Sequence, residues 1–199
     1  MHSLKDKFDD LRHRLAHDRS LESAGSEPIF YLVFPVSEIL EVKRQTKAWI
    51  AKLSNDGWRV VALSMVDAVV SVLQKNKLRK LWLQAEKKKL EAAAAAAQAI
   101  DFRETVTTLS KALTEGPELM AIVEEKLAEA ASAPEGLLLL TDLEALHPYL
   151  RINSIEAKLQ NNVRCPVVVL YPGKREGKTS LRFLEFYPAD PNYRSEHIG

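Results

Sequence analysis

From Ile29 to Leu63 the chain reads IFYLVFPVSEILEVKRQTKAWIAKLSNDGWRVVAL, and this stretch decides the fold. It begins with a short apolar run, Ile29–Phe34, which is typical of a strand covered on both faces. Apolar residues then recur with a helical period until Asn55-Asp56-Gly57 stops the helix, and a second apolar strand follows over Trp58–Leu63. A strand, a helix and a strand form a βαβ unit, so we expect the two strands to run parallel with a right-handed crossover.

Two further apolar runs extend this sheet toward the carboxyl end. Leu137–Leu140 and Pro166–Leu170 are predicted strands, with a helix around Ser154–Gln160 between them. Leu181–Tyr187 follows a connection too short for a helix, so we expect it to pair antiparallel as an edge strand. The residues from Asp190 onward are predicted to be irregular. The sequence therefore predicts a three-layer α/β fold, with a mostly parallel sheet of about five strands flanked by helices.

The amino-terminal residues predict a separate helix. Leu4, Phe8, Leu11 and Leu15 lie at spacings of four, three and four, which is the stripe of an amphipathic helix. The residues from Ser23 to Pro28 are rich in Gly and Ser and end in Pro, which favours a linker. We therefore expect residues 1–27 to form a helical arm and linker, whose helix docks either on its own chain or on a partner.

Residues 77–133 predict an all-helical insertion between the second and third strands. A helix that opens at Ser64 precedes it, and Leu78–Ala99 is dense in Leu, Lys, Glu and Ala, all of which favour helix. Two more helices are predicted to end at Gly116-Pro117 and near Pro134. The composition is that of an ordinary globular protein, so residues 1–199 are expected to form a single domain.

Charge and cysteine content exclude several functional classes. Lys and Arg total 28 against 27 Asp and Glu, so the formal net charge of +1 draws the chain neither to nucleic acid nor to an anionic membrane. The only cysteine, Cys165, excludes an internal disulfide framework and favours a reducing compartment. Neither a secretory stretch nor a run of ~18 apolar residues occurs, so we expect a cytoplasmic protein without membrane association.

Polar residues follow several of the predicted strands. Parallel sheets bind ligands at the carboxyl ends of their strands, which gathers six residues on one rim: Ser37, Ser64, Thr141, Asp142, Tyr171 and Gly173. Ser37, Ser64 and Asp142 are predicted to cap the helices or turns that follow them, Ser64 in a capping box with Asp67. A magnesium site at Asp142 is the less favoured alternative. This set contains no nucleophile and base pair, so the sequence predicts no catalytic residue, cofactor or metal site.

The segment Gly173-Lys174-Arg175-Glu176-Gly177-Lys178-Thr179 is similar to a phosphate-binding loop. That motif needs four residues between its glycines and leads from a strand into a helix. Here three residues intervene and a strand follows, so a hairpin with solvated lysines is the favoured interpretation.

One local charge run could contact nucleic acid. Lys75–Lys89 contains seven basic residues and one Glu: the basic residues are Lys75, Lys77, Arg79, Lys80, Lys87, Lys88 and Lys89, with Trp82 available to stack. Asp101–Glu135 contains eight acidic and three basic residues, which could neutralise the first segment if the helices fold back on each other. We favour this self-complementary insertion over a nucleic-acid surface.

Several blocks of the chain, most of them in its carboxyl-terminal third, resemble BrxB, a core component of bacterial BREX phage-defence systems. The blocks are, in order, a strand similar to Ile29–Phe34, a segment resembling His147-Pro148-Tyr149-Leu150-Arg151-Ile152-Asn153 through Leu159-Gln160-Asn161-Asn162, a strand leading into Tyr171-Pro172-Gly173, a strand like Leu181–Phe186, and Asn192-Tyr193-Arg194. The central region, Lys75–Ser132, matches no pattern of the family.

This resemblance implies a protein without a known catalytic centre that associates with other BREX proteins, above all the phosphatase-like protein PglZ. It makes the motif residues candidates for partner binding: Arg151, Asn153, Tyr171, Pro172, Gly173, Asn192, Tyr193 and Arg194. Hydrogen bonding in loops and caps, or turn geometry, is the favoured interpretation of Arg151, Asn153 and the Tyr171–Gly173 segment. The leading hypothesis is a non-catalytic scaffold or adaptor. Its alternatives are a nucleic-acid-binding accessory protein that uses residues 75–89 and a degenerate nucleotide-binding protein. Whether the chain forms a homodimer is left open by the sequence.

Overall fold

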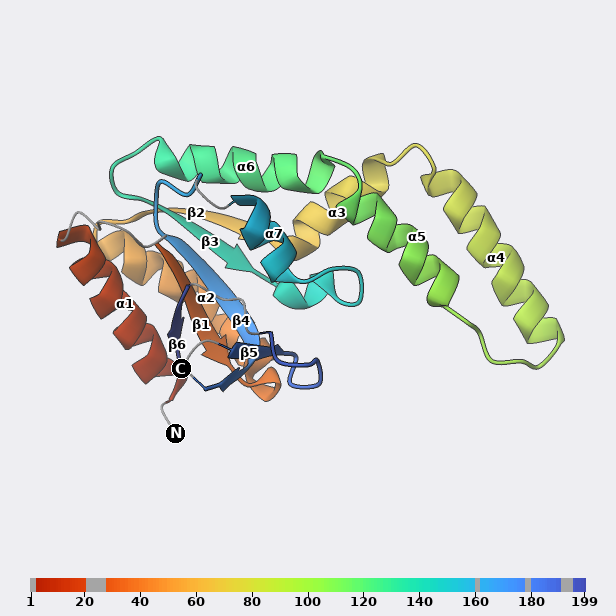
Figure 1. Ribbon diagram of the computed structural model, residues 1–199, viewed down its shortest axis with the longest axis horizontal. Coiled ribbons are helices and arrows are strands. Elements are labelled where there is room, and N and C mark those ends of the chain that lie inside the picture. The colour runs from red at the N-terminus through yellow and green to blue at the C-terminus, as the bar shows by residue number, and fades with distance from the viewer. Residues whose placement is uncertain (1–2, 21–27, 160–161, 178–179, 191–194) are drawn as a thin grey trace.

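Among the residues that the structure describes, the sheet has six strands, and five of them run parallel. The computed structural model describes residues 3–20, 28–159, 162–177, 180–190 and 195–199. The parallel strands lie in the order β2-β3-β4-β1-β6 (Figure 1). Their bounds are β1, Ile29–Phe34; β2, Arg59–Ser64; β3, Gly136–Thr141; β4, Val167–Glu176; and β6, Glu196–Ile198. The prediction of a mostly parallel α/β sheet is confirmed.

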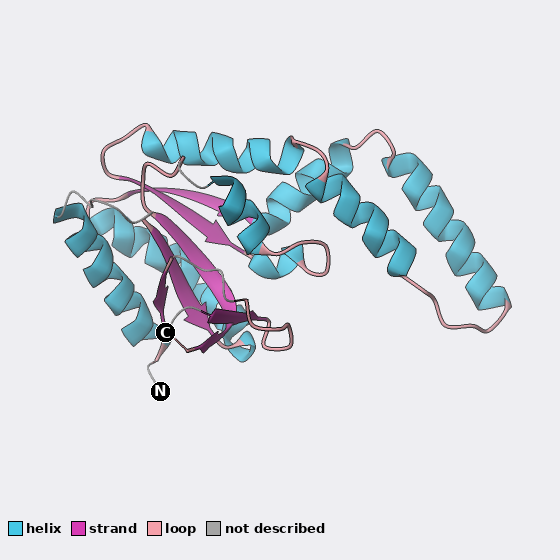
Figure 2. Ribbon diagram, in the orientation of Figure 1, coloured by secondary structure: helices cyan, strands magenta, loops and turns pink. Residues whose placement is uncertain are grey.

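The central strand β1 is apolar throughout because both of its faces are covered. All six of its residues are buried. Side chains alternate across a strand, so Phe30 and Leu32 pack on one helical layer while Tyr31 and Val33 pack on the other. The first layer consists of α1 (Leu4–Ser20) and α2 (Ile39–Asn55), and the second includes α3 (Met65–Lys75), α6 (Glu118–Ala131) and α7 (Ile152–Leu159). Figure 2 shows the sheet between these two layers.

The amino-terminal helix α1 docks on its own chain. Its four predicted apolar residues are buried against β1 and α2. The Phe8 ring stacks on Trp49 of α2 at 4.7 Å between centroids, and Arg12 Nη2 donates to Asp56 Oδ1 at 2.7 Å. The predicted linker from Ser23 to Pro28 lies outside the described residues except for Pro28.

The chain beyond β3 departs from the prediction at two places. Strand β4 continues past Leu170 to Glu176, and its second half pairs antiparallel with β5 (Ser180–Phe183). The antiparallel strand is therefore confirmed, but it ends at Phe183 instead of Tyr187. The prediction that the residues from Asp190 onward are irregular is wrong for Glu196–Ile198, which forms β6 and pairs parallel with β1.

The helical segment predicted over residues 77–133 divides into two parts. Helices α4 (Arg79–Ala95) and α5 (Arg103–Thr114) form a hairpin that extends away from the sheet (Figure 1). In contrast, α6 packs along β2 and β3 and buries Leu119, Val123, Leu127 and Ala130 in the core. Helix α4 has no buried residue, so its helical state rests on its own composition and on one partly covered face.

None of the helices in the described ranges is long and apolar enough to cross a membrane.

Candidate functional site

The strand-end rim gathers three of the polar residues that the sequence singles out. Ser64 ends β2, and Thr141 ends β3, immediately before Asp142. Both hydroxyls donate to Asp142 Oδ2, from Ser64 Oγ at 2.8 Å and from Thr141 Oγ1 at 2.7 Å. Asp142 adopts a left-handed backbone conformation, with φ of 57°, which Asp tolerates better than most residues.

Lys43 of α2 completes this polar cluster. Its Nζ lies 2.9 Å from Asp142 Oδ1 and 2.5 Å from Glu144 Oε1. Burial raises the pKa of Asp142, but the hydrogen bonds from Lys43, Thr141 and Ser64 outweigh it, so the pKa lies below its usual value. The hydrogen bonds that Lys43 donates to Glu144 and Asp142 raise the pKa of Lys43. In this cluster one cation is shared by two carboxylates.

A shallow cavity of about 250 Å³ lies beside this cluster. It is lined by Phe34, Leu170, three residues at the end of β3 and beyond it, and one side of α2 that carries Lys43 and Lys47. The carboxylates that border it are already engaged by Lys43 and the two hydroxyls. Within the described part of the chain, no group of three or more His, Cys, Asp or Glu residues is placed to hold a metal ion.

Of the three predicted caps, Ser37 is wrong, whereas Ser64 and Asp142 occupy the predicted positions without the expected side-chain hydrogen bond. A 3-10 turn over Val36–Glu38 precedes α2, so Ser37 lies inside that turn, before the helix. Ser64 and Asp142 occupy cap positions, but neither side chain makes a capping hydrogen bond. Each instead bonds to the other across the sheet. Capping patterns are local, whereas this contact joins residues far apart in the chain.

The motif residues Arg151 and Asn153 hold the end of the chain in place. The Arg151 guanidinium lies over the Tyr187 ring, 4.4 Å from its centroid. Asn153 Nδ2 donates to Asp190 Oδ2, and the Asp190 backbone pairs with Leu181 of β5. These contacts agree with the favoured structural interpretation of both residues. Asn192, Tyr193 and Arg194 lie outside the described residues.

The predicted turn at Tyr171-Pro172-Gly173 is wrong, because β4 runs through all three residues. All three are buried. The Tyr171 ring meets Tyr31 edge-on at 5.5 Å between centroids, and Gly173 lies against the backbone of Arg182 in β5. These residues therefore belong to the core and to the hairpin, and not to an open rim.

The loop that is similar to a phosphate-binding motif is a hairpin. Gly173–Glu176 pairs antiparallel with β5, and no helix follows the second glycine, Gly177. Lys178 and Thr179 lie outside the described residues. The backbone here does not form the strand-to-helix turn on which phosphate binding depends.

A strained turn after β5 exposes one aromatic ring. Leu184 and Glu185 both have positive φ, of 50° and 62°, and Glu185 Oε1 accepts a hydrogen bond from the Val36 backbone at 3.0 Å. Phe186 follows and is 63% exposed, with its ring centroid 5.3 Å from His147 and 4.5 Å from Tyr187. No sequence pattern indicates this exposure, because the apolar run predicts a strand here.

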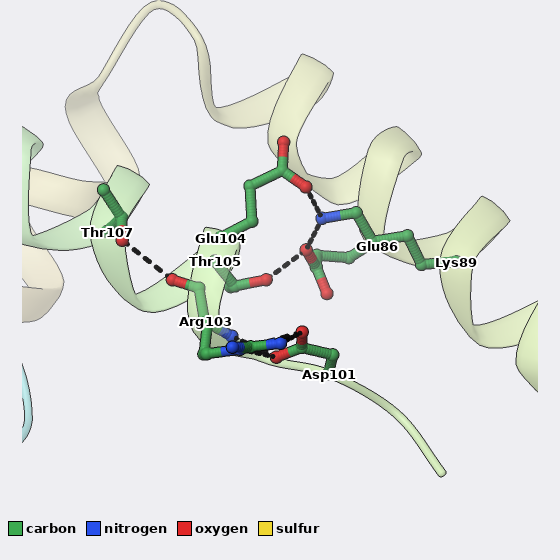
Figure 3. A network of polar contacts seen from close by, with 7 residues as sticks. All are labelled: Glu86, Lys89, Asp101, Arg103, Glu104, Thr105 and Thr107. Atoms are coloured by element: carbon green, nitrogen blue, oxygen red, sulfur yellow. Dashed lines mark hydrogen bonds and ion pairs between the residues drawn. The ribbon is translucent and has the colours of Figure 1, made fainter. Parts of the chain in front are cut away.

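The α4–α5 hairpin brings opposite charges together at one place. Lys89 Nζ of α4 lies 2.7 Å from Glu104 Oε2 of α5, and Thr105 Oγ1 donates to Glu86 (Figure 3). Arg103 pairs with Asp101 within its own segment, at 2.7 Å between Nη2 and Oδ2. The predicted pairing between the basic and acidic segments is therefore real, but it involves only one basic residue of the run.

Most of the basic run faces solvent. Lys75, Lys77, Arg79, Lys80, Lys87 and Lys88 are all exposed. Within the described residues, the only ion pair that any of these six makes joins Lys87 to Glu91, on the next turn of α4, at 3.8 Å. Trp82 lies toward α5, where it lines a small cavity with Thr105 and Leu109.

Large apolar side chains are also exposed on this hairpin. Ten large hydrophobic residues are exposed among the described residues, and six of them lie between Leu78 and Phe102: Leu78, Leu81, Leu83, Leu90, Ile100 and Phe102. Such a concentration marks an interaction surface more often than a purely solvated one.

Comparison with known proteins identifies one family. A family model described as "BREX protein BrxB" matches residues 61–198, which is more than half of the chain. No curated protein and no solved structure matches significantly. The matched range includes the whole of the α4–α5 hairpin, for which sequence reading alone found no family pattern.

Proposed function

The chain belongs to the BrxB family and is thereby a BREX phage-defence component, and we propose that it works there as a non-catalytic scaffold or adaptor that binds another BREX protein. The proposed partner is the phosphatase-like protein PglZ, which is the partner that the family resemblance implies. We place this complex in the cytoplasm, since the single cysteine is a buried free thiol.

The observation that carries the proposal is the exposed apolar surface of the α4–α5 hairpin. Leu81, Leu83 and Leu90 are 60%, 56% and 44% exposed on a helix that buries none of its residues. Apolar surface that stays in water is unfavourable, and covering it with a partner stabilises the complex by about 25 cal/mol for each Å² of apolar surface removed from water. Exposed leucines of this density on a projecting element therefore indicate a surface that a partner covers. A protein partner supplies the apolar surface that this requires.

The polar rim supports the non-catalytic part of the proposal. Asp142 and Glu144 both pair with Lys43, and the Asp142 carboxylate also accepts hydrogen bonds from two hydroxyls. An acid held in this way is suited to fix two strand ends and helix α2, because its lone pairs are directed at groups of the protein itself.

Co-purification tests this function. The full chain, carrying an affinity tag, is expressed with PglZ and the other proteins of its BREX system, and the retained proteins are identified by mass spectrometry. We expect PglZ to be retained in a defined ratio. If no BREX protein is retained, the proposal is wrong. If a BREX protein other than PglZ is retained, that protein is the partner.

A nucleic-acid-binding accessory role is the second candidate, and the exposed basic residues favour it. Lys77, Arg79 and Lys80 face solvent near the start of α4. Binding through these residues would fall steeply as salt rises, since phosphate contacts release counterions. Electrophoretic shifts with duplex DNA at several salt concentrations test this role. A charge-reversed Lys77→Glu/Arg79→Glu/Lys80→Glu variant is the matched control.

A further inference from the structure

Helix α4 carries one continuous exposed stripe in which cations and leucines alternate. Lys80, Leu83, Lys87 and Leu90 lie at spacings of three, four and three, which places them on a single face of the helix. All four side chains are exposed. The face that meets α5 is a different one, since Glu86 and Lys89 make the contacts across the hairpin (Figure 3).

The charge of the stripe is positive along its length. Lys80 makes no ion pair with any described residue, and Lys87 has only the 3.8 Å contact with the exposed Glu91. Arg79 and Lys88 lie beside the stripe and are also exposed. The leucines are therefore framed by cations that no carboxylate of the described chain neutralises closely.

We propose that this stripe is the docking site for an acidic amphipathic helix of a BREX partner protein. The proposal rests on the proposed function and adds the surface and the chemistry of the partner. An occupant that presents apolar side chains at the same three- and four-residue spacing covers Leu83 and Leu90. Asp or Glu residues on either side of those apolar side chains then pair with Lys80 and Lys87, which fixes the register of the two helices.

The leucines disfavour nucleic acid as the occupant. A phosphate backbone pairs with Lys80 and Lys87, but it leaves Leu83 and Leu90 between them against charged, hydrated groups. Basic surfaces that bind nucleic acid place polar or aromatic residues between their cations. Here the nearest aromatic residue, Trp82, lies toward α5.

A second copy of the chain is disfavoured by symmetry. A two-fold interface through the stripe is centred near residue 85 and therefore places Lys87 opposite Leu83 of the second copy, and Lys80 opposite its Leu90. Each cation then meets an apolar side chain and no carboxylate, so covering it is unfavourable. The occupant that satisfies both the leucines and the cations is an acidic helix of another protein.

Three variants of the full chain test the proposal in the same co-purification and by affinity measurement with the captured BREX protein. Leu83→Gln/Leu90→Gln removes the apolar part of the stripe, and Lys80→Glu/Lys87→Glu reverses its charge. Leu40→Gln/Arg44→Glu makes the matched changes on α2, where Leu40 is 66% exposed. Gln and Glu favour helix, and the altered side chains are exposed, so we expect all three variants to keep the thermal stability of the wild type.

We expect each α4 variant to weaken partner binding by on the order of tenfold or more, and the α2 variant to stay within about twofold of the wild type. Binding by the wild type should also weaken as salt rises, and charge reversal should abolish this dependence. If both α4 variants bind the partner as tightly as the wild type does, the stripe is not the docking site. The proposed adaptor function would be unaffected by that result. If the wild type captures no BREX protein, both proposals fail.

Two other outcomes would assign the stripe to a different occupant. A dimer of the wild type in sedimentation that Leu83→Gln/Leu90→Gln dissociates would show that a second copy covers it. Duplex DNA binding that is lost on charge reversal but kept by the leucine variant would show a nucleic-acid surface. Either result overturns the proposal.

Discussion

Ser64 at the end of β2 donates a hydrogen bond to Asp142 after β3, with 2.8 Å between Oγ and Oδ2. The contact joins the ends of two adjacent parallel strands, and Lys43 ties the same carboxylate to α2. Asp142 therefore serves as a structural anchor at the rim.

We expect Asp142→Asn to lower the free energy of unfolding by about 1–2 kcal/mol, because Asn keeps the left-handed backbone but loses the charge that Lys43 pairs with. Urea denaturation at pH 7 measures the loss. The pKa of Asp142 is lower in the folded chain, so its contribution is present above the unfolded pKa and is lost as pH falls through the folded value. Equal stability of the variant and the wild type at pH 7 would contradict the anchoring role.

We expect the stability of the sheet edge that contains His197 to fall in acid. Burial, reinforced by the positive charge of Arg175, lowers the pKa of His197 from 6.5 to about 4. The folded state thus favours the neutral ring, so the stability it provides is present above pH 6.5 and is lost as pH falls from 6.5 to 4. The loss attributable to His197 reaches about 3 kcal/mol.

A His197→Gln variant separates this residue from the others that titrate in acid. Urea denaturation of both proteins between pH 7 and pH 4 should show a difference in pH dependence confined to that window. Parallel curves for variant and wild type would mean that His197 does not govern the acid response.

Gly173 is predicted to be structural and not to contact a partner. A Cβ at this position would lie 2.2 Å from the carbonyl oxygen of Arg182 and 2.8 Å from Tyr171 Cε1. We expect Gly173→Ala to cost about 3 kcal/mol, because the backbone of β5 must shift to admit the methyl group.

The matched control is Gly177→Asn, since Gly177 has φ of +68° with no atom within 4 Å of a Cβ, and Asn tolerates this conformation. Its expected cost is less than about 1 kcal/mol. Thermal unfolding of the two variants measures the contrast, and similar melting temperatures would refute the steric account.

Replacing Phe8 measures how much the docking of α1 contributes to the free energy of unfolding. Its ring is 2% exposed and stacks on Trp49 with an interplanar angle of 8°. We expect Phe8→Ala to cost about 3–4 kcal/mol, whereas Lys5→Ala, on the exposed face of the same helix, should change stability by less than about 0.5 kcal/mol. Chemical denaturation measures both. A small loss for Phe8→Ala would mean that α1 is a loosely attached arm.

The parts of the fold that follow from local pattern could be predicted from the sequence. Ile29–Phe34 has the continuous apolar run of a strand covered on both faces, and the stripe of Leu4, Phe8, Leu11 and Leu15 has a helical period. Strand β6 could not be predicted, because three residues are too few to show a period and its position depends on the neighbouring β1.

The candidate surfaces were less accessible to prediction. The basic run could be identified in the sequence, but not which of its members would pair, since only Lys89 reaches the acidic helix α5. Tyr171 and Gly173 look like turn residues, yet β4 continues through them because β1 pairs with Tyr171 and β5 pairs with Gly173. In both cases the outcome depends on contacts between distant segments, which composition and spacing do not encode.

The position of β1 in the sheet affects the order of events during translation. Its two hydrogen-bonded neighbours, β4 and β6, begin at Val167 and Glu196, so this apolar strand leaves the ribosome long before either one is synthesised. An unpaired run of this kind aggregates readily. The nascent chain should therefore depend on chaperones until β4 emerges, and ribosome-bound chains stalled before Val167 should be sensitive to proteases in the sheet region.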